Sequence, residues 1–132
     1  MKKIEAIIRP SALQAVCTAL ARRGVEGLTV SEVAGVGHEP GHIDRYRGAF
    51  YRVDLHPRMR VEVVATDVQA RPIAVTIIEA ARTGRVGDGL VIITAVDEAI
   101  RIRTAERGIA AITTDGIAET DRTAALSSAA RA

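Results

Sequence analysis

Aromatic side chains and cysteine are scarce in this chain of 132 residues. It has one Phe, two Tyr, no Trp and one Cys. A single cysteine excludes an internal disulfide and a cysteine-rich metal site. The core must therefore be built from Ile, Val, Leu and Ala, and we expect Cys17 to serve as a small buried hydrophobe.

The chain also lacks an excess of charge of one sign and any long apolar run. Its 18 Lys and Arg against 16 Asp and Glu leave a net charge of +2, so we expect no nucleic-acid partner. The N-terminal stretch MKKIEA carries a charge inside its apolar part, which is unlike a signal peptide. No apolar run approaches the ~20 residues of a membrane span. We expect one soluble, cytoplasmic domain with no direct membrane insertion.

Apolar periodicity predicts two successive β-α-β units. Ser11 and the Thr66–Asp67 pair are expected to cap the two helices, and Pro72 predicts either a kink or a later start of the second. The expected strands cover residues 1–8, 28–36, 58–65 and 90–96, and the expected helices 12–22 and 67–81. This order predicts an α+β fold, the ferredoxin-like βαββαβ arrangement with an antiparallel sheet.

Two segments fall outside these elements. Residues 37–57 form a long connection of the kind that is functional or disordered. Residues 108–132, rich in Ala, Thr and Ser, form a C-terminal extension, expected to be disordered or to fold over a ligand. The domain proper is expected to cover 1–107. An open four-stranded sheet leaves edges to cover, so we expect an oligomer.

Two features suggest a phosphate site. Three glycines within residues 83–89 could turn backbone N–H groups toward one point and hold phosphate oxygens; the alternative is a helix end followed by a tight turn. Arg101 and Arg103 lie two apart on a short alternating stretch, which predicts two guanidinium groups on one strand face. Their alternative is a solvated strand face.

All three aromatic residues lie in the long connection. Tyr46, Arg47, Phe50 and Tyr51 resemble an interface hot spot, and Tyr51 is a candidate for covalent modification. The alternative is that Phe50, Tyr51 and Val53 simply begin the third strand.

Histidines flank the aromatic cluster. The spacing of His38, His42 and His56 matches no structural zinc pattern, so we expect no dedicated metal site. Glu39 is instead a candidate ligand for Mg²⁺ bound to a nucleotide.

Several motifs together resemble the PII nitrogen-regulatory signal-transduction proteins, without gaps from residue 1 to about 107. They are MKKIEAIIRP (1–10), GLTVSEV (27–33), YRGA (46–49) with Tyr51, EAARTG (79–84), GDG (87–89) and RIRT (101–104). The resemblance implies a regulator rather than an enzyme. It further implies a homotrimer with adenine nucleotides bound between subunits. A T-loop at about 37–55 would bind a target transporter, enzyme or regulator.

The resemblance also assigns a nucleotide site. Its phosphate side would be lined by the last five of the following residues, and its base and sugar side by the others. The site comprises Ile7, Thr29, Gly35, Val36, Gly37, Val64, Gly87, Asp88, Gly89, Arg101 and Arg103.

Departures from the family pattern change the expected ligands. Leu90 stands where the family has a lysine that reaches the phosphates, so ADP or AMP should compete well with ATP. Glu39 replaces a glutamine that helps bind Mg²⁺ beside 2-oxoglutarate, and Arg58 keeps the charge of a lysine that pairs with that acid. We expect no tightly bound cofactor. The second effector is 2-oxoglutarate or, in an alternative linked to inorganic carbon, bicarbonate.

Overall fold

The computed structural model describes residues 1–37, 42–46, 49–53 and 55–113, with only the backbone of 42–46 and 49–53 described. Within these ranges the strands and helices occur in a fixed order along the chain. They are β1 (Lys2–Ile8), a 3-10 turn (Pro10–Ala12), α1 (Leu13–Arg22), β2 (Thr29–Gly35), β3 (His42–Tyr46), β4 (Ala49–Val53), β5 (His56–Ala65), α2 (Asp67–Ala81), β6 (Gly89–Ala95) and α3 (Ile109–Ile112).

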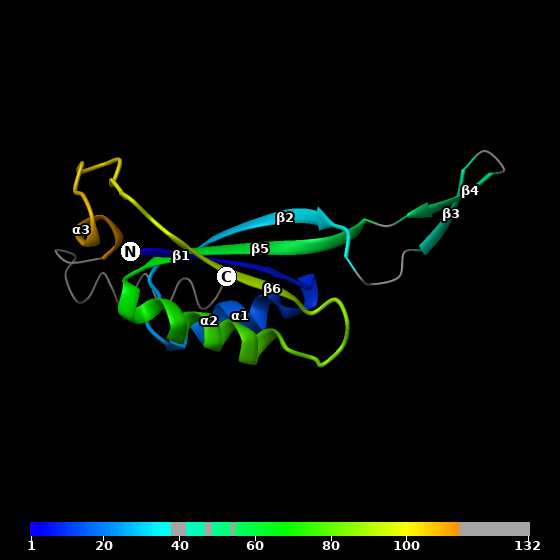
Figure 1. The fold of residues 1–132 in the computed structure, drawn as a ribbon, viewed down its shortest axis with the longest axis horizontal. Coiled ribbons are helices and arrows are strands. Elements are labelled where there is room, and N and C mark those ends of the chain that lie inside the picture. The colour runs from blue at the N-terminus through cyan, green and yellow to red at the C-terminus, as the bar shows by residue number, and fades with distance from the viewer. Residues whose placement is uncertain (38–41, 47–48, 54, 114–132) are drawn as a thin grey trace.

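Four strands form one antiparallel sheet in the order β2-β5-β1-β6. Helices α1 and α2 lie side by side on one face of this sheet, and the opposite face carries no helix among the described residues (Figure 1). This is the ferredoxin-like α+β fold that the periodicity predicts. Strands β3 and β4 form a separate two-stranded hairpin between β2 and β5.

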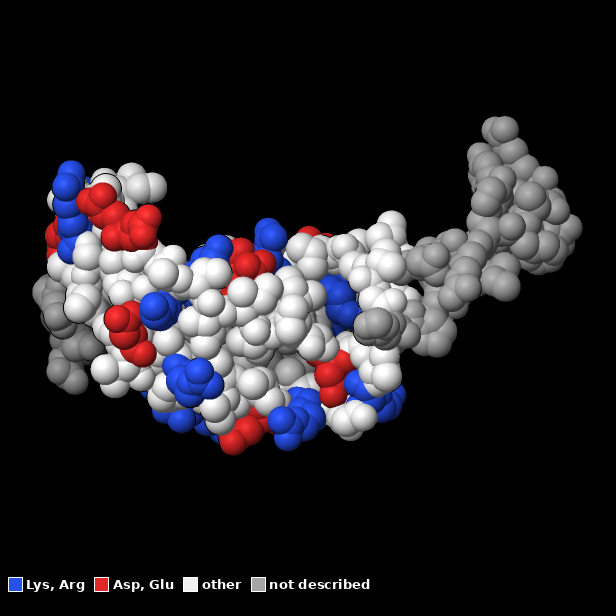
Figure 2. Space-filling model, in the orientation of Figure 1, with Lys and Arg blue, Asp and Glu red and all other residues white. Residues whose placement is uncertain are grey.

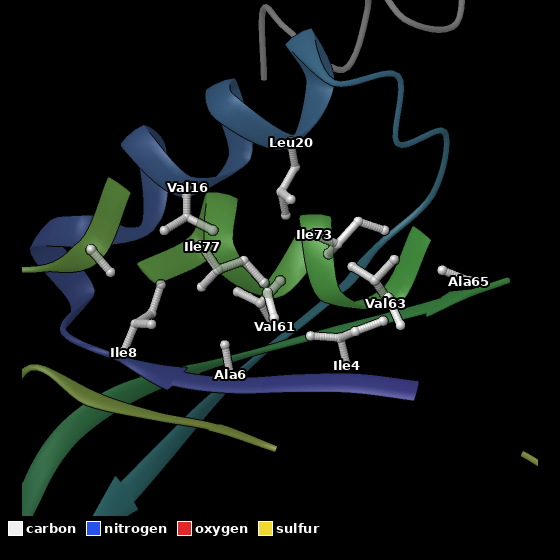
Figure 3. Close-up of a cluster of buried hydrophobic side chains, with 13 residues drawn as sticks. Ile4, Ala6, Ile8, Val16, Leu20, Val61, Val63, Ala65, Ile73 and Ile77 are labelled. Carbon is white, nitrogen blue, oxygen red and sulfur yellow. The ribbon is translucent and has the colours of Figure 1, made fainter. Parts of the chain in front are cut away.

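The core lies between the sheet and the two helices. Ile4, Ala6 and Ile8 alternate toward the helices along β1, and Leu20 and Ile77 meet them from α1 and α2 (Figure 3). Among the residues whose side chains are described, every buried hydrophobic one is Ile, Val, Leu or Ala, which agrees with the composition expected for the core. Burial of one such large side chain contributes about 1.5–3 kcal/mol.

The first helix begins differently from the expectation. Ser11 lies inside the 3-10 turn, and α1 begins at Leu13 with no side-chain cap. The prediction that Ser11 caps this helix is therefore wrong. At its other end Gly24 adopts a positive φ of 86° and donates its N–H to the carbonyl of Ala21 at 3.0 Å, the closure that glycine favours.

The second helix begins at Asp67, so the later start allowed for Pro72 is wrong. Thr66 and Gln69 form a reciprocal capping box at its N-terminus, which stabilises the first turn. Pro72 cannot donate a hydrogen bond within the helix, but its own carbonyl accepts one from the Thr76 hydroxyl at 2.8 Å. Tertiary packing of Ile73 and Ile77 then outweighs the missing bond.

The connection between β2 and β5 contains regular structure, the hairpin of β3 and β4. Phe50, Tyr51 and Val53 belong to β4, which pairs with β3 in the hairpin, whereas β5 begins only at His56. The alternative that these three residues begin the third strand is therefore wrong.

No helix in the described part of the chain is both long and apolar enough to cross a membrane.

Candidate functional site

The eleven predicted nucleotide residues form two groups at opposite ends of the sheet. One group, which we call the glycine end, lies where β1 and β2 end and β6 begins. It contains Ile7, Gly35, Val36, Gly37, Gly87, Asp88 and Gly89. The other, the arginine end, lies where β2 begins, β5 ends and the chain leaves β6. It contains Thr29, Val64, Arg101 and Arg103. Figure 1 shows the α2–β6 loop and α3 at these two ends.

Strand pairing builds the glycine end. Gly89 lies opposite Ile8, and Ile7 lies opposite Leu90, so the loop between α2 and β6 enters the sheet beside the end of β1. Gly35 lies at the end of β2, opposite His56. A Cβ at Gly89 would meet the carbonyl oxygen of Ile7 at 1.8 Å, which explains why only glycine fits there.

The loop at 83–89 closes on the carboxylate of Asp88. The backbone N–H groups of Thr83 and Gly84 donate to its Oδ2 at 2.8 and 2.9 Å, and the Thr83 hydroxyl donates to its Oδ1. These donors are therefore directed at a side chain of the protein itself. The loop is in part the helix end and tight turn of the alternative interpretation, and a direct role of Asp88 toward phosphate stays a prediction.

The hydrogen bonds to Asp88 predict a pH dependence. The Thr83 hydroxyl and backbone N–H are the main causes that hold the pKa of Asp88 well below its ordinary value. The ionised carboxylate therefore stabilises the fold above the unfolded-state pKa of about 4, and that stability is lost as pH falls below it. We expect Asp88→Asn to lower the thermal unfolding midpoint at pH 7, and to lower it by less at pH 3, where part of the stabilisation is already lost. An equal difference at both pH values would contradict this.

A cavity of about 880 Å³ lies at the arginine end. Thr29, Val64 and Arg101 all line it, as does Glu62, which lies directly opposite Thr29 in the β2–β5 pairing. The predicted site does not include Glu62. The sequence pattern could have indicated this residue, because the alternation of β5 puts Glu62 and Val64 on the same face.

Arg101 and Arg103 do not lie on a strand, so that prediction is wrong. Only Ile100 forms an isolated bridge, to Arg107, and the chain turns between them, with Ala105 donating its N–H to the Arg101 carbonyl at 2.8 Å. The Arg101 guanidinium donates to the carbonyls of Ala111, at 3.1 Å, and Thr113. It thus lies against the C-terminal end of α3, where backbone carbonyls attract cations. Arg103 is exposed in the turn.

The proposed effector residues are only partly described. Arg58 lies opposite Val33, donates to the Pro57 carbonyl at 2.9 Å and lines a second cavity of about 730 Å³ that also contains Leu55. Glu39 falls outside the described residues. Within the described ranges no group of three or more His, Cys, Asp and Glu could hold a metal ion.

The aromatic residues of the long connection lie on the hairpin. Tyr46 ends β3, Phe50 and Tyr51 lie in β4, and Tyr51 pairs with Asp44 across the hairpin. Arg47 falls outside the described residues. Cys17 is half-buried rather than fully buried as expected, and burial raises the pKa of its thiol.

Comparison with known proteins identifies the family. The model of the family "Nitrogen regulatory protein P-II" matches residues 1–106. The P-II protein of Rhizobium meliloti is 50% identical over 112 residues, which cover 85% of this chain and 100% of the relative. That of Rhodospirillum rubrum is 49% identical over 82% of this chain and 96% of its own length. That of Nostoc punctiforme is 47% identical over 85% and 100%. The chain therefore belongs to the nitrogen regulatory protein P-II family.

Proposed function

We propose that this protein is a signal-transduction regulator of nitrogen metabolism and not an enzyme. It binds ADP, AMP or ATP between the subunits of a homotrimer, and the nucleotide selects the conformation of the T-loop (37–55) that binds a target protein. The main observation behind this proposal is that the predicted nucleotide residues divide into a glycine end and an arginine end. Membership of the P-II family supports the same function.

The residues predicted for the base and sugar side alone lie at both ends of the sheet, and the distances between them are long for one base and sugar. Thr29 and Gly35 lie at the two ends of β2, six residues or about 20 Å apart at ~3.3 Å per residue. Ile7 and Lys3, the residue opposite Val64, are about 13 Å apart along β1 by the same rise. A single site that uses both groups therefore needs the glycine end of one subunit and the arginine end of another.

The uncovered face and edge of the sheet support an oligomer. The face opposite the helices presents Ile7, Val64 and Leu90 according to the strand register, and Leu90 is 63% exposed. Strand β6 lies at the edge of the sheet, and an uncharged band crosses Figure 2 where β6 runs in Figure 1. Such apolar faces and unpaired edges are covered in stable proteins, here by neighbouring subunits.

The uncharged side chain of Leu90 favours nucleotides with fewer phosphates. Leu90 adds no charge beside Gly89, so Arg101 and Arg103 supply the main positive charge to the phosphates, and ADP or AMP competes well with ATP. Mg²⁺ at Glu39 and 2-oxoglutarate at Arg58 complete the proposed ligands, none of them tightly bound. The relatives are named for nitrogen regulation, which gives no support to the bicarbonate alternative, and we do not propose it.

Deletion of residues 43–53 tests the role of the T-loop. We expect the immobilised full chain to capture its target from cell extract to different extents in ATP and ADP, and the deletion to lose this capture. Loss of a hot spot of about 2–4 kcal/mol is sufficient for that. Light scattering should give the same oligomer mass for both chains, and a chain ending at Thr113 serves as the matched control. Capture that survives the deletion would refute the proposed role of the loop.

A further inference from the structure

Arg9 binds the α2–β6 loop from outside it. Its Nη2 donates to the carbonyl of Val86 at 2.6 Å, and its Nε lies 3.4 Å from Oδ1 of Asp88. The Arg9 side chain is only 15% exposed and that of Asp88 24%. Arg9 follows directly after β1, whose last residue, Ile8, pairs with Gly89. The end of one strand thus holds the loop that begins another.

The loop depends on these polar contacts for its shape. Gly84, Gly87 and Gly89 all have positive φ, and ordering glycines costs more backbone entropy than ordering other residues. The apolar side chain of the loop, Val86, is 63% exposed and adds little packing. The hydrogen bonds to Asp88 and from Arg9 therefore have to fix the loop.

The contact at Val86 also sets the direction of a backbone donor. The peptide between Val86 and Gly87 is planar and trans, so its carbonyl and its N–H point in opposite directions. Because Arg9 holds the Val86 carbonyl, the N–H of Gly87 points away from Arg9. The guanidinium in addition offsets the charge of Asp88, which would otherwise repel an anion at this loop.

We infer that Arg9 is a positioning residue for phosphate binding: it orients the Gly87 peptide and neutralises Asp88, without itself touching the ligand. This inference rests on the proposed function, because it takes the ligand to be the phosphate group of an adenine nucleotide at Gly87 and Gly89. Arg9 lies 79 residues from Asp88 in sequence, and no motif of the phosphate loop includes it.

Calorimetric titration with ADP and with adenosine tests the inference. Arg9→Met keeps an apolar stem but removes both contacts, and we expect at least a tenfold loss of ADP affinity with adenosine affinity unchanged. Arg9→Lys keeps the charge but not the fork, and should restore part of the loss. Arg107→Met is the matched control, because it removes an exposed pair with Glu98 at 3.4 Å elsewhere and should change neither affinity.

Four results would overturn the inference, and they are distinguishable. If Arg9→Met leaves the ratio of ADP to adenosine affinity unchanged while the parent binds both, Arg9 has no positioning role. If both affinities fall equally, or if Arg9→Lys rescues nothing, Arg9 only supports the fold. If the parent chain binds no ADP, the proposed function itself fails and the inference falls with it. Faster amide exchange at Gly87 in Arg9→Met, beside a selective loss of ADP, would support the inference directly.

Discussion

Replacing Gly89 by alanine is expected to lower the free energy of unfolding by at least about 3 kcal/mol. Gly89 has a φ of 115°, a region that alanine adopts only under strain. Its new Cβ would lie 1.8 Å from the carbonyl oxygen of Ile7. That oxygen belongs to β1, which pairs on both sides within the sheet, so the backbone cannot move aside without loss of pairing. The same substitution should abolish ADP binding.

Gly27→Ala is the control for this substitution. An added Cβ at Gly27 meets nothing within 4 Å, so its unfolding midpoint should remain close to that of the parent. Thermal and urea unfolding of both variants measure the difference. A Gly89→Ala protein with the stability of the parent would show that the β1–β6 junction is looser than described here.

The Arg101→Ala, Arg103→Ala double variant is expected to lower ADP affinity by at least about 100-fold. Each substitution removes a hydrogen bond between charged groups, which is worth about 1.5–3 kcal/mol. A loss of about 1.4 kcal/mol corresponds to a tenfold lower affinity. Adenosine, which has no phosphate, should lose much less.

Two controls separate phosphate binding from the local fold. Arg103→Ala alone leaves the hydrogen bonds of Arg101 to the end of α3 in place, and should still weaken ADP at least tenfold. Arg107→Ala changes a neighbouring exposed arginine and should leave ADP affinity unchanged. An unaltered ADP affinity of the double variant would remove both arginines from the phosphate site.

The sheet and both long helices were predictable because their side-chain patterns are long. Alternation along β1 and β5, and helical spacing in α1, persist over seven to ten residues. The stretch at 100–103 has only four residues, and its alternation is overridden by the hydrogen bond from Ala105 to Arg101 and the positive φ of Ala105. Ser11 was similarly overridden by Pro10, which begins a 3-10 turn.

The sequence proposes a set of site residues but does not give their geometry. Motifs point to Gly87, Asp88 and Gly89, yet the direction of the Asp88 carboxylate depends on contacts with Thr83 and Arg9 that spacing alone does not reveal. The two ends of the site become apparent only when the strand register puts Thr29 and Gly35 at opposite ends of β2. Long-range pairing decides the second point, and the first depends on the local contact with Thr83 together with the long-range one with Arg9.

Titration of mixed oligomers with ADP tests the central claim, that two subunits complete each site. One variant chain carries Arg101→Ala and Arg103→Ala. The other is Gly37→Asp, which puts a charged carboxylate on the predicted base and sugar side of the glycine end and whose Cβ meets nothing within 4 Å. Neither variant should bind ADP well when it is expressed alone. Co-expressed, they should recover wild-type affinity at a fraction of sites, where one subunit supplies an intact glycine end and its neighbour an intact arginine end. A mixture that binds ADP no better than either variant alone would contradict the claim.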